Sequence, residues 1–479
     1  MRFRMCKLLM CVVFSRALGF GQSDAEIRQE ADRIFAKYGS STPGVAVGIL
    51  REGKVALVQG YGMASLEHGI SIGKDTVFQV GSVSKQFTAF AVYLLERQGK
   101  LSLQDDVRKY VPEVPDYGKP LRIQHLLAHS SGIRDQAALL SLAGWRMDDV
   151  MTTAQVLRVI GRQSELNFEP GSAYLYCNTG YTLLSEVVRR VSGVSFAEFT
   201  KRNIFEPLRM KDTQFLEDHE TVIKNRADSY EYEGGVYKRV NLNDAVAGPS
   251  NLYTTAGDML RWALNLQDPT VGDREMIRRF NEASVLNNGE KTVYYSLPGD
   301  IGYHAKGQIQ KVYRGLEVWS HGGHAGGFRS TFWRFPGQGF AVVLLSNDEN
   351  FPQLQNAEAL IDFCLREQLR PRHETVSSAA SAQSTAVTPH LELEEFEGTY
   401  YNSEIEARYT TKVRNGKLTL LHLRHGEIPL EVLGKDRFSG RIEFPVQCEF
   451  LRDAAGKVTG LRISNFGAKN VKFQRSFGT

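Results

Sequence analysis

The sequence predicts an α+β fold in which an antiparallel sheet is flanked by helices, followed by a second, smaller unit of short strands. Two apolar runs near the start, at residues 44–50 and 55–60, read as a hairpin. A similar pair lies at residues 329–335 and 340–345. Helical and loop segments fill the region between the pairs. Both ends of the first unit therefore contribute strands to one antiparallel sheet.

The elements follow in order along the first unit. Apolar residues at helical spacing predict an amphipathic helix at residues 26–38. Glu52-Gly53 supplies the turn of the first hairpin, and residues 336–339 (Pro-Gly-Gln-Gly) turn the second. A helix at residues 354–369 ends the unit.

The second unit follows a linker. Residues 371–388 are rich in Ser and Ala, show no apolar period and cannot build a core. From there to residue 479 the pattern is one of short alternating strands, for example at 418–423, 442–444 and 471–473. Turn signals such as Asn415-Gly416 separate them. The domain division is therefore 23–370 and 389–479.

Residues 1–22 read as a signal peptide. They combine a basic start, an apolar run at 8–14 and small residues at Ala17, Gly19 and Gly21, with cleavage expected near Gly21 or Gln22. A lipoprotein anchor at Cys11 is disfavoured because the preceding Met10 is large. We expect a secreted or periplasmic protein. The apolar run is too short to span a bilayer, and no later segment is apolar enough.

Composition limits the remaining function classes. The formal charge is +4, and residues 1–22 carry four basic residues and no acid, so the rest of the chain is balanced. Nothing resembles a basic stripe for nucleic acid. Only Cys177, Cys364 and Cys448 remain after the leading segment, an odd number that gives no disulfide framework. No cofactor or metal is expected, and the oligomeric state is left open.

The most informative feature is Ser82-Val83-Ser84-Lys85, because an apolar helical period starts there and ends before Gly99. Ser82 and Lys85 share one helix face, about 5–6 Å apart at Cβ. Burial of that face lowers the pKa of the ammonium, so that a neutral amine can take the Ser proton. Free N–H groups at the helix start can hold an oxyanion. Ser71 and Lys74 repeat the spacing, but they open no amphipathic helix.

Two further motifs accompany Ser82. Tyr176-Cys177-Asn178 precedes an apolar helix, and residues 320–324 (Ser-His-Gly-Gly-His) lie on a strand-like run followed by Gly326-Gly327. In order and spacing, the chain resembles the serine β-lactamase and penicillin-binding protein superfamily, with its S-x-x-K, Y-x-N and K-T-G elements. The D-aminopeptidase and esterase branch of class C β-lactamase-like proteins fits best. Residues 122–133 and 168–171 also look family-like, and the resemblance covers residues 27–369.

The resemblance implies a fold, a site and a set of roles. It adds an all-helical lobe beside the sheet, with the site at their junction, and a C-terminal lipocalin-like β-barrel. Ser82 is the implied nucleophile, with Lys85 and Tyr176 sharing the proton work. Asn178 would hold Lys85 and the substrate carbonyl. The further implied positions are the backbone N–H groups of Ser82 and His324 for the oxyanion hole, and Gly322, Gly323 and Arg329 for substrate binding.

The third element departs from the family pattern. His321 stands where the family has Lys, and Gly322 where it has Thr. An imidazole near neutral pH is a much weaker cation than an ammonium, which argues against efficient recognition of β-lactams or peptidyl-D-Ala-D-Ala. Acyl transfer through Ser82 is not affected, and His321 stays among the candidate catalytic residues.

Other matches have simpler readings. His125 and His129 lie four residues apart, but no third ligand stands at metalloprotease spacing, so structural histidines are favoured. Tyr400-Tyr401-Asn402 fits Y-x-N out of order, and Tyr400 is expected to pack inside the small barrel. Cys177 reads as an apolar filler.

Three functions therefore remain. The first is a secreted serine hydrolase of D-amino-acid amides or peptides, or of small esters. The second is a penicillin-binding DD-carboxypeptidase or a β-lactamase. The third is a catalytically silent binding or sensor protein on the same fold, which the complete set of Ser82, Lys85, Tyr176 and Asn178 disfavours.

Overall fold

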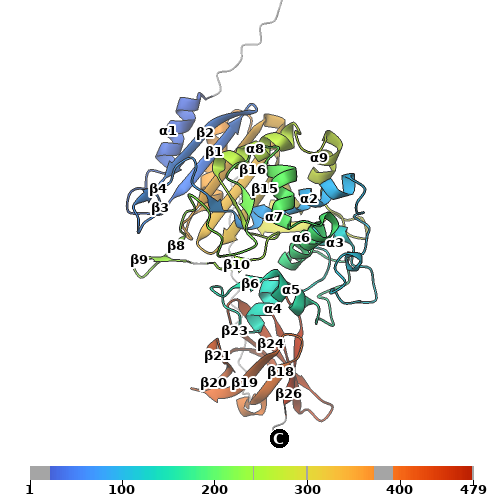
Figure 1. Cartoon of the computed structure of the whole chain (residues 1–479). Helices are drawn as coiled ribbons and strands as arrows, with labels where there is room; N and C mark the ends of the chain where they lie inside the picture. The colour runs from blue at the N-terminus through green and yellow to red at the C-terminus, as the bar shows by residue number, and fades with distance from the viewer. Residues whose placement is uncertain (1–21, 241, 298–299, 372–391, 477–479) are drawn as a thin grey trace, which may run out of the picture.

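A computed structural model describes residues 22–240, 242–297, 300–371 and 392–476 (Figure 1). The predicted signal peptide and linker lie outside these residues, apart from Gln22 and Pro371 at their borders. Within the described residues, no helix has both the length and the apolar character needed to cross a membrane.

The centre of the first unit is an eight-stranded sheet in which all neighbours are antiparallel, in the order β12-β13-β14-β15-β16-β17-β1-β2. Strand β1 lies between β2 and β17, so the two predicted hairpins pair with each other, and β2 forms one edge of the sheet. The strands are β1 (Val45–Arg51), β2 (Lys54–Tyr61), β12 (Val293–Leu297), β13 (Asp300–His304), β14 (Ile309–Tyr313), β15 (Leu316–Ala325), β16 (Phe328–Phe335) and β17 (Phe340–Ser346).

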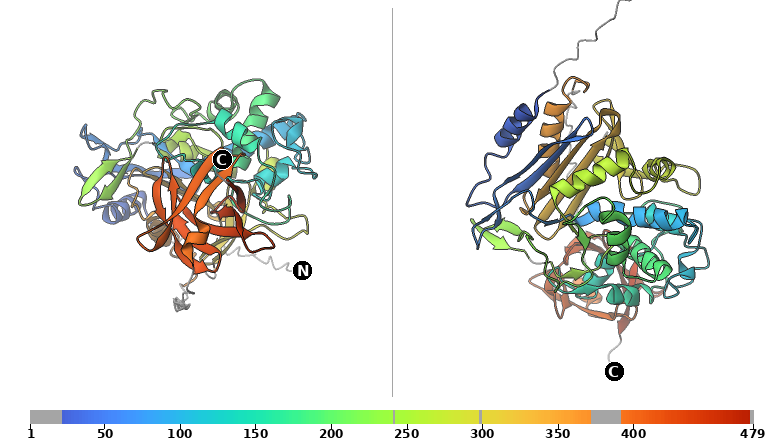
Figure 2. Two further views of the ribbon diagram at one scale, coloured as in Figure 1. Left: turned by 90° about the horizontal axis from the view of Figure 1, so that it is seen from below. Right: turned by 45° about the horizontal axis from the view of Figure 1, so that its top comes forward.

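Helices cover both faces of this sheet (Figures 1 and 2). On one face, α1 (Asp24–Ile34) and α10 (Gln353–Cys364) pack together over the strands. On the other, α8 (Ala256–Gln267) packs on β1 and β17. Successive side chains of a strand point to opposite faces, so β1 sends Val45 and Val47 toward α1 and α10, and Ala46 into the core on the other side.

A helical lobe fills the space beside the sheet. Helix α6 packs against α2, α3 and α4. The lobe contains α2 (Lys85–Arg97), α3 (Ile123–Leu127), α4 (Gln136–Leu142), α5 (Thr153–Ile160), α6 (Asn178–Ser192) and α7 (Phe196–Thr200), and α9 (Arg274–Asn281) packs on α2. Short strands between the helices are β3 (Met63–Ser65), β4 (Ile70–Ser71), β5 (Phe78–Gln79), β6 (Met151–Thr152), β7 (Gln214–Phe215), β8 (Tyr230–Glu233), β9 (Val236–Arg239), β10 (Asp244–Ala245) and β11 (Leu252–Thr254).

The C-terminal unit is a nine-stranded antiparallel sheet that is nearly closed into a barrel, in the order β21-β20-β19-β18-β26-β25-β24-β23-β22. The two end strands, β21 and β22, are separated by Leu430 alone, so one stretch of chain borders both ends. The strands are β18 (Gly398–Asn402), β19 (Ala407–Arg414), β20 (Lys417–His422), β21 (Gly426–Pro429), β22 (Glu431–Gly434), β23 (Arg437–Arg441), β24 (Pro445–Arg452), β25 (Val458–Ser464) and β26 (Val471–Ser476).

This barrel lies against α4 and α5, on the far side of the helical lobe from the large sheet (Figure 1). Tyr409 donates a hydrogen bond to the carbonyl of Leu142 (2.9 Å), and Arg424 forms two bonds of 2.6 and 2.7 Å with Asp149. The buried apolar residues of lobe and barrel form one continuous cluster. The predicted α+β class and the added barrel are confirmed.

The predicted elements differ from the structure mainly at their ends. The first helix ends at Ile34 and not at residue 38, although Phe35 and Tyr38 are still buried in the following turn. The last helix of the first unit ends at Cys364 and not at 369. The predicted strand at 442–444 is wrong, because Arg441 pairs with Pro445 and these three residues form the loop between β23 and β24.

Candidate active site

Ser82 lies in a 3-10 turn (Gly81–Ser84) that leads directly into α2. The predicted helix start is therefore correct in position, with a tighter first turn. Lys85 is the first residue of α2, and its Nζ donates a hydrogen bond of 3.1 Å to Ser82 Oγ. The Lys85 side chain is fully buried, whereas Ser82 is partly exposed. Burial of the apolar face of α2 thus places the Lys85 amine inside the protein, within hydrogen-bond distance of the hydroxyl of the partly exposed Ser82.

Three acceptors surround Lys85 Nζ. Besides Ser82, it donates to Asn178 Oδ1 (2.9 Å) and to the carbonyl of Pro249 (2.8 Å). Asn178 is the first residue of α6, and Pro249 lies in the loop between β10 and β11. Segments far apart in the sequence therefore fix the amine in one position.

Tyr176 completes the hydrogen bonds at the nucleophile. Its hydroxyl donates to Ser82 Oγ at 2.8 Å, and its side chain is held just before α6. Behind it, the His129 ring lies 4.4 Å from the Tyr176 ring, centre to centre. His129 Nδ1 in turn accepts a hydrogen bond from the backbone N–H of Cys177 (3.0 Å). The ring of Tyr176 is thus packed against a histidine that is itself held by the backbone of the neighbouring residue.

Burial shifts the two proton-bearing groups in opposite directions. It lowers the pKa of Lys85 to about 7, although the nearby Asp135 and Cys177 raise that pKa. Burial also raises the pKa of Tyr176, and the hydrogen bond with Ser82 only partly offsets this. Both shifts have one cause, since a low dielectric disfavours the charged form of each group. Near neutral pH the amine is partly deprotonated and the phenol stays protonated.

His321 lies in the same cleft as a neutral imidazole. Burial and, to a smaller extent, the positive charge of Lys85 lower its pKa to about 4, and a contact with the carbonyl of Gly322 opposes the shift. Its ring centre is 6.3 Å from that of Tyr176. A group with this pKa carries no charge in the physiological range, so the cationic role of the family's Lys has no equivalent at this position.

The strand edge beside Ser82 belongs to β15. Strand β14 pairs with β15 only as far as Ser320, so residues 321–325 continue past the end of their neighbour and lie beside the 3-10 turn of Ser82. Gly81 has φ +50°, and a Cβ there would lie 2.7 Å from His324 N. This contact requires glycine, because both the conformation and the space exclude a side chain. It brings the backbone of His324 next to the start of the turn.

A cleft of about 590 Å³ contains Ser82 and three of the residues predicted to act with it, Tyr176, His321 and His324. Gly322 also borders it. Apolar and polar side chains share the rest of the wall, which comprises Tyr294, Ile309, Lys311, Ser320, Trp333, Gln353, Leu354 and Glu358. The side chain of His324 contacts Gln353 at 2.9 Å (Nε2 to Nε2), while its backbone lies against Gly81, the residue before Ser82.

Two predicted substrate-binding residues lie elsewhere. Arg329 Nη1 donates to the carbonyls of Gly326 (2.8 Å) and Phe328 (2.9 Å), and its Nη2 pairs with Glu349 at 3.1 Å. Its guanidinium is thus occupied within the β15–β16 turn, and it does not line the cleft. The α-carbon of Gly323 faces Val80 and Ser330 inside the protein. Neither placement supports direct substrate contact.

Sequence reasoning missed Asp135, which is fully buried and accepts a hydrogen bond of 2.6 Å from the backbone N–H of Asn178. It also missed Pro249, whose carbonyl accepts from Lys85. Asp135 follows shortly after the family-like stretch at 122–133, so its position gave a weak signal. A backbone acceptor such as Pro249 O leaves no mark on residue type.

The alternative matches are separated from the cleft. Ser71 lies on β4 with its hydroxyl toward Met63, and Lys74 is exposed. Tyr400 is fully buried in the barrel, as predicted, and donates to the carbonyl of Phe396 (2.8 Å). His125 Nδ1 accepts from the N–H of Arg122 (3.2 Å), a structural bond. Across the described ranges, no group of three or more potential metal ligands is brought together.

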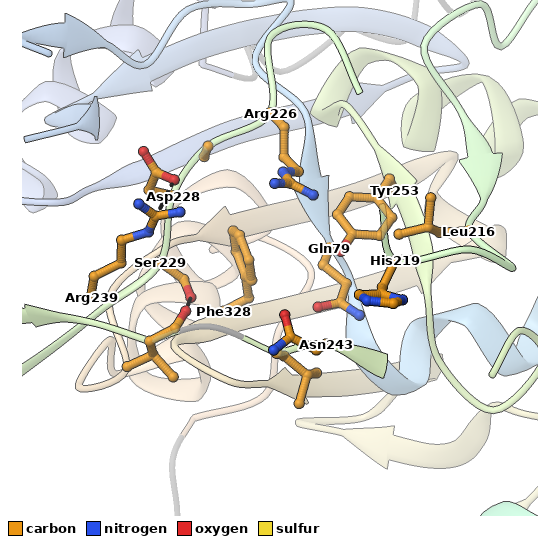
Figure 3. Close-up of a pocket in the computed structure, with 13 residues that line it drawn as sticks. Gln79, Leu216, His219, Arg226, Asp228, Ser229, Arg239, Asn243, Tyr253 and Phe328 are labelled. Atoms are coloured by element: carbon orange, nitrogen blue, oxygen red, sulfur yellow. Dashed lines mark hydrogen bonds and ion pairs between the residues drawn. The ribbon is translucent and has the colours of Figure 1, made fainter. Parts of the chain in front are cut away.

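A second cavity, of about 240 Å³, borders β5 and β11 (Figure 3). Gln79, three residues before Ser82, lies on its wall, and its amide donates to Asn251. Arg226 also faces it, while Arg239 forms an ion pair of 3.6 Å with Asp228 (Figure 3). None of the predicted site residues lines this cavity, so the reactive groups gather in the larger cleft.

Comparison with known proteins agrees with this arrangement. Residues 31–364 match the Beta-lactamase family. The chain is 27% identical over 321 residues to a D-aminopeptidase of Gluconobacter oxydans, covering 66% of this chain and 58% of that protein. It is also 27% identical over 323 residues to penicillin-binding protein 4* of Bacillus subtilis, covering 64% of this chain and 68% of that protein. The chain thus spans less than two thirds of the length of the aminopeptidase.

Among solved structures, the octameric penicillin-binding protein homologue from Pyrococcus abyssi aligns with a TM-score of 0.63 at 22% identity. The alignment covers 94% of this chain and 100% of that one. At this identity the likeness concerns the fold alone. Its coverage nevertheless extends well beyond the part of the chain that matches the family.

Proposed function

Because the chain belongs to the Beta-lactamase family, we propose that it is a serine hydrolase that forms an acyl-enzyme on Ser82. One observation carries the proposal: Ser82 Oγ lies within hydrogen-bond distance of both Lys85 Nζ (3.1 Å) and Tyr176 OH (2.8 Å). A nucleophile held by a base and an acid with opposite pKa shifts is typical of covalent catalysis.

The pKa shifts assign the proton transfers. Neutral Lys85 takes the Ser82 proton as Oγ attacks the substrate carbonyl carbon, and the Tyr176 phenol gives its proton to the departing amine or alcohol. The ammonium of Lys85 then returns a proton to Tyr176. In the second half, water attacks the acyl-enzyme ester and Lys85 accepts its proton; the Lys85 ammonium then gives this proton to Ser82 Oγ as the ester breaks, so that Ser82 leaves as the free hydroxyl and Lys85 is neutral again. Backbone N–H groups of Ser82 and His324 hold the oxyanion in both halves.

The two positions predicted to hold a substrate carboxylate, His321 and Arg329, do not offer a cation to the cleft. His321 is uncharged and the Arg329 guanidinium is occupied elsewhere, so neither offers a cation to a carboxylate. Small esters and D-amino-acid amides or peptides are therefore the proposed substrates, which agrees with the similarity to a protein named D-aminopeptidase. Penicillin-binding DD-carboxypeptidase or β-lactamase activity is the alternative, supported by the likeness to penicillin-binding protein 4*.

Active-site labelling tests the proposal. Wild-type protein and the Ser82→Ala variant are treated with a fluorophosphonate and with a labelled penicillin, and adducts are detected by intact mass. We expect one fluorophosphonate adduct in the wild type and none in Ser82→Ala. Ser71→Ala is the matched control, since Ser71 also precedes a Lys by three residues, and it keeps full labelling.

Each other outcome has a definite meaning. A full adduct on Ser82→Ala would exclude Ser82 as the nucleophile. A long-lived penicillin adduct on the wild type would favour the penicillin-binding alternative. Absence of every adduct and of ester turnover in the folded wild type would favour a silent binding protein.

Two further expectations remain part of this proposal. We infer secretion or a periplasmic location, because residues 1–22 combine a basic start, an apolar run and small residues before the expected cleavage site. N-terminal sequencing of the exported protein tests it. We also infer the domain division at residues 23–370 and 389–479, with a lipocalin-like second domain, which the nearly closed antiparallel sheet supports.

A further inference from the structure

One loop of the barrel packs against the start of α4, close to the residues that hold Lys85. Residues 465–469, between β25 and β26, lie against the start of α4. The carbonyl of Gly467 accepts the backbone N–H of Asp135 at 2.9 Å. Asn465 donates to the carbonyl of Ala138 at 3.0 Å, and Asn167 donates to the Gly467 carbonyl at 3.0 Å. This loop thus contacts the helical lobe at Asp135.

The loop is folded on itself by one buried amide. Asn465 Oδ1 accepts the N–H groups of Gly467 (3.3 Å) and Ala468 (2.9 Å). Asn465 and Ala468 are both almost fully buried. These internal bonds hold the loop in one shape, in which the Gly467 carbonyl faces the lobe as an acceptor.

Asp135 connects this loop to the catalytic groups. Its Oδ1 accepts from the N–H groups of Ala137 (2.9 Å) and Ala138 (3.2 Å), and its Oδ2 accepts the N–H of Asn178 at 2.6 Å. Asn178 Oδ1 then accepts from Lys85 Nζ at 2.9 Å. Hydrogen bonds therefore run without a break from Gly467 through Asp135 and Asn178 to Lys85.

We propose that Asp135 is a positioning residue for the Lys85–Asn178 pair and that the barrel loop at residues 465–469 holds it in place. The barrel is then part of the support of the active site. The inference rests on the proposed serine hydrolase function. Three N–H bonds hold the Asp135 carboxylate in one orientation, which fixes the start of α6 relative to α2, and they oppose the burial that raises the pKa of this carboxyl.

The contact leaves no space for a side chain at Gly467. A Cβ there would lie 2.5 Å from Asp135 Cβ and 3.3 Å from Ala138 Cβ. A Gly467→Ala substitution in the barrel must therefore displace either Asp135 in the helical lobe or the loop itself. Gly434, on β22, gives a matched control, because a Cβ there meets only Arg437 at 3.7 Å.

Charge gives a second, independent readout. The negative charge of Asp135 raises the pKa of Lys85, so its removal lowers that pKa. The acid limb of kcat/KM, which requires neutral Lys85, then moves to lower pH. Burial keeps the other titratable groups around this pair neutral. It raises the pKa of the Cys177 thiol and of the Tyr176 and Tyr181 phenols. It lowers the pKa of the imidazoles of His129, His304 and His321. The nearby fixed charges belong to Arg134 and its partners Glu165 and Glu404.

The test uses the full chain and the neutral ester p-nitrophenyl butyrate. Gly467→Ala is expected to lower kcat about 10- to 100-fold, the range for a small displacement of catalytic groups. Gly434→Ala stays within about twofold of the wild type. Asp135→Asn, which keeps the size of the side chain, lowers kcat and shifts the acid limb to lower pH. In the Asp135→Asn background, Gly467→Ala adds little further loss, because both changes weaken the same link from residue 135 to Asn178.

The inference is overturned if folded Gly467→Ala matches Gly434→Ala, or if Asp135→Asn keeps the wild-type acid limb. Fully additive losses in the double variant also overturn it. Should Gly467→Ala fail to fold, the pH profile of Asp135→Asn still decides. Failure of the proposed function is distinct, because the wild type itself would then neither hydrolyse the ester nor react with fluorophosphonate.

Discussion

At the scale of single residues, the site depends on burial that acts oppositely on an amine and a phenol. Lys85 and Tyr176 both contact Ser82 Oγ, yet burial lowers the pKa of the first and raises that of the second. A base must be deprotonated and an acid protonated at the same pH, and this pair meets both conditions near neutrality. The same environment leaves His321 uncharged.

The pH profile of kcat/KM follows from these charge states. The deprotonated form of Lys85 is the active one, so kcat/KM for a neutral ester rises as pH increases through about 7. Because the Tyr176 pKa is raised above 10, no alkaline limb from this phenol appears below that pH. Steady-state kinetics between pH 5 and 10 check both limbs. A profile that falls between pH 8 and 10, in a protein that remains folded, contradicts this assignment.

Two variants, each lacking one of the proposed proton-transfer groups, test the roles of Lys85 and Tyr176 separately. Lys85→Ala and Tyr176→Phe are each expected to lower turnover by about 10²–10⁴, the range for a positioned base or acid. Tyr176→Phe keeps the ring that packs against His129, so its loss reports the hydroxyl alone. Burst kinetics identify the rate-limiting step in each variant. Near-normal turnover in both variants, with chemistry rate-limiting, contradicts the assigned roles.

His321 provides a test of substrate charge. A neutral imidazole cannot discriminate by charge, so the ratio of kcat/KM for matched anionic and neutral substrates stays constant from pH 6 to 8. His321→Lys places a cation there and favours the carboxylate-bearing substrate. The added charge also lowers the pKa of Lys85, which moves the acid limb to lower pH. A wild-type ratio that falls as pH rises would instead show that His321 is charged when it binds substrate.

At the scale of elements, the site is formed where a helix start meets a strand edge. Strand β15 extends past β14, and the 3-10 turn of Ser82 lies beside the exposed length of its edge. Gly81 permits the contact through its positive φ and its lack of a side chain. The geometry of the predicted oxyanion hole therefore depends on one glycine between β5 and α2.

Gly81→Ala tests this junction. The substitution must separate the turn from His324 or force the backbone out of its conformation, so kcat is expected to fall about 10²-fold. Gly73→Ala is the matched control, because a Cβ at Gly73 meets nothing within 4 Å. Steady-state kinetics and circular dichroism on both variants separate a local effect from unfolding. Unchanged kcat in Gly81→Ala would mean that the His324 backbone is not needed for the oxyanion.

At the scale of the whole molecule, the barrel and the helical lobe share one apolar core. Tyr409 bonds to the lobe at Leu142, and the loop at residues 465–469 bonds to α4. Large shared apolar interfaces couple the unfolding of the parts that they join. We therefore expect the barrel and the hydrolase unit to unfold together.

Intrinsic fluorescence tests this coupling, because all four Trp residues lie in the first unit, at positions 145, 262, 319 and 333. Their fluorescence and the far-UV circular dichroism of the whole chain should give coincident unfolding curves. Leu461→Ala, a fully buried change in the barrel, should destabilise by about 2–5 kcal/mol and move both curves. Leu423→Ala, at a side chain that is 98% exposed, should move neither. A Trp curve unaffected by Leu461→Ala would show that the units unfold separately.

Apolar periodicity and motif order were enough to predict the fold class and the residues around Ser82. Apolar periods located the hairpins and the helix after Ser82, because side chains on one face of an element recur at a fixed spacing. The same spacing put Lys85 beside Ser82, and motif order indicated Tyr176 and Asn178 as companions. Element ends were less certain, as the early ends of α1 and α10 show, since caps and turns depend on contacts outside the element.

The pKa shifts at the site and the contacts between segments far apart in the sequence became visible in the three-dimensional structure alone. The burial that keeps both Lys85 and Tyr176 in their neutral forms comes from α6, the loop of Pro249 and the lobe together. Arg329 pairs with Glu349 and so does not line the cleft. The hydrogen bond from Asp135 to Gly467 joins residues more than 300 positions apart in the sequence. Such effects arise from desolvation and packing between distant segments, which residue type and spacing do not encode.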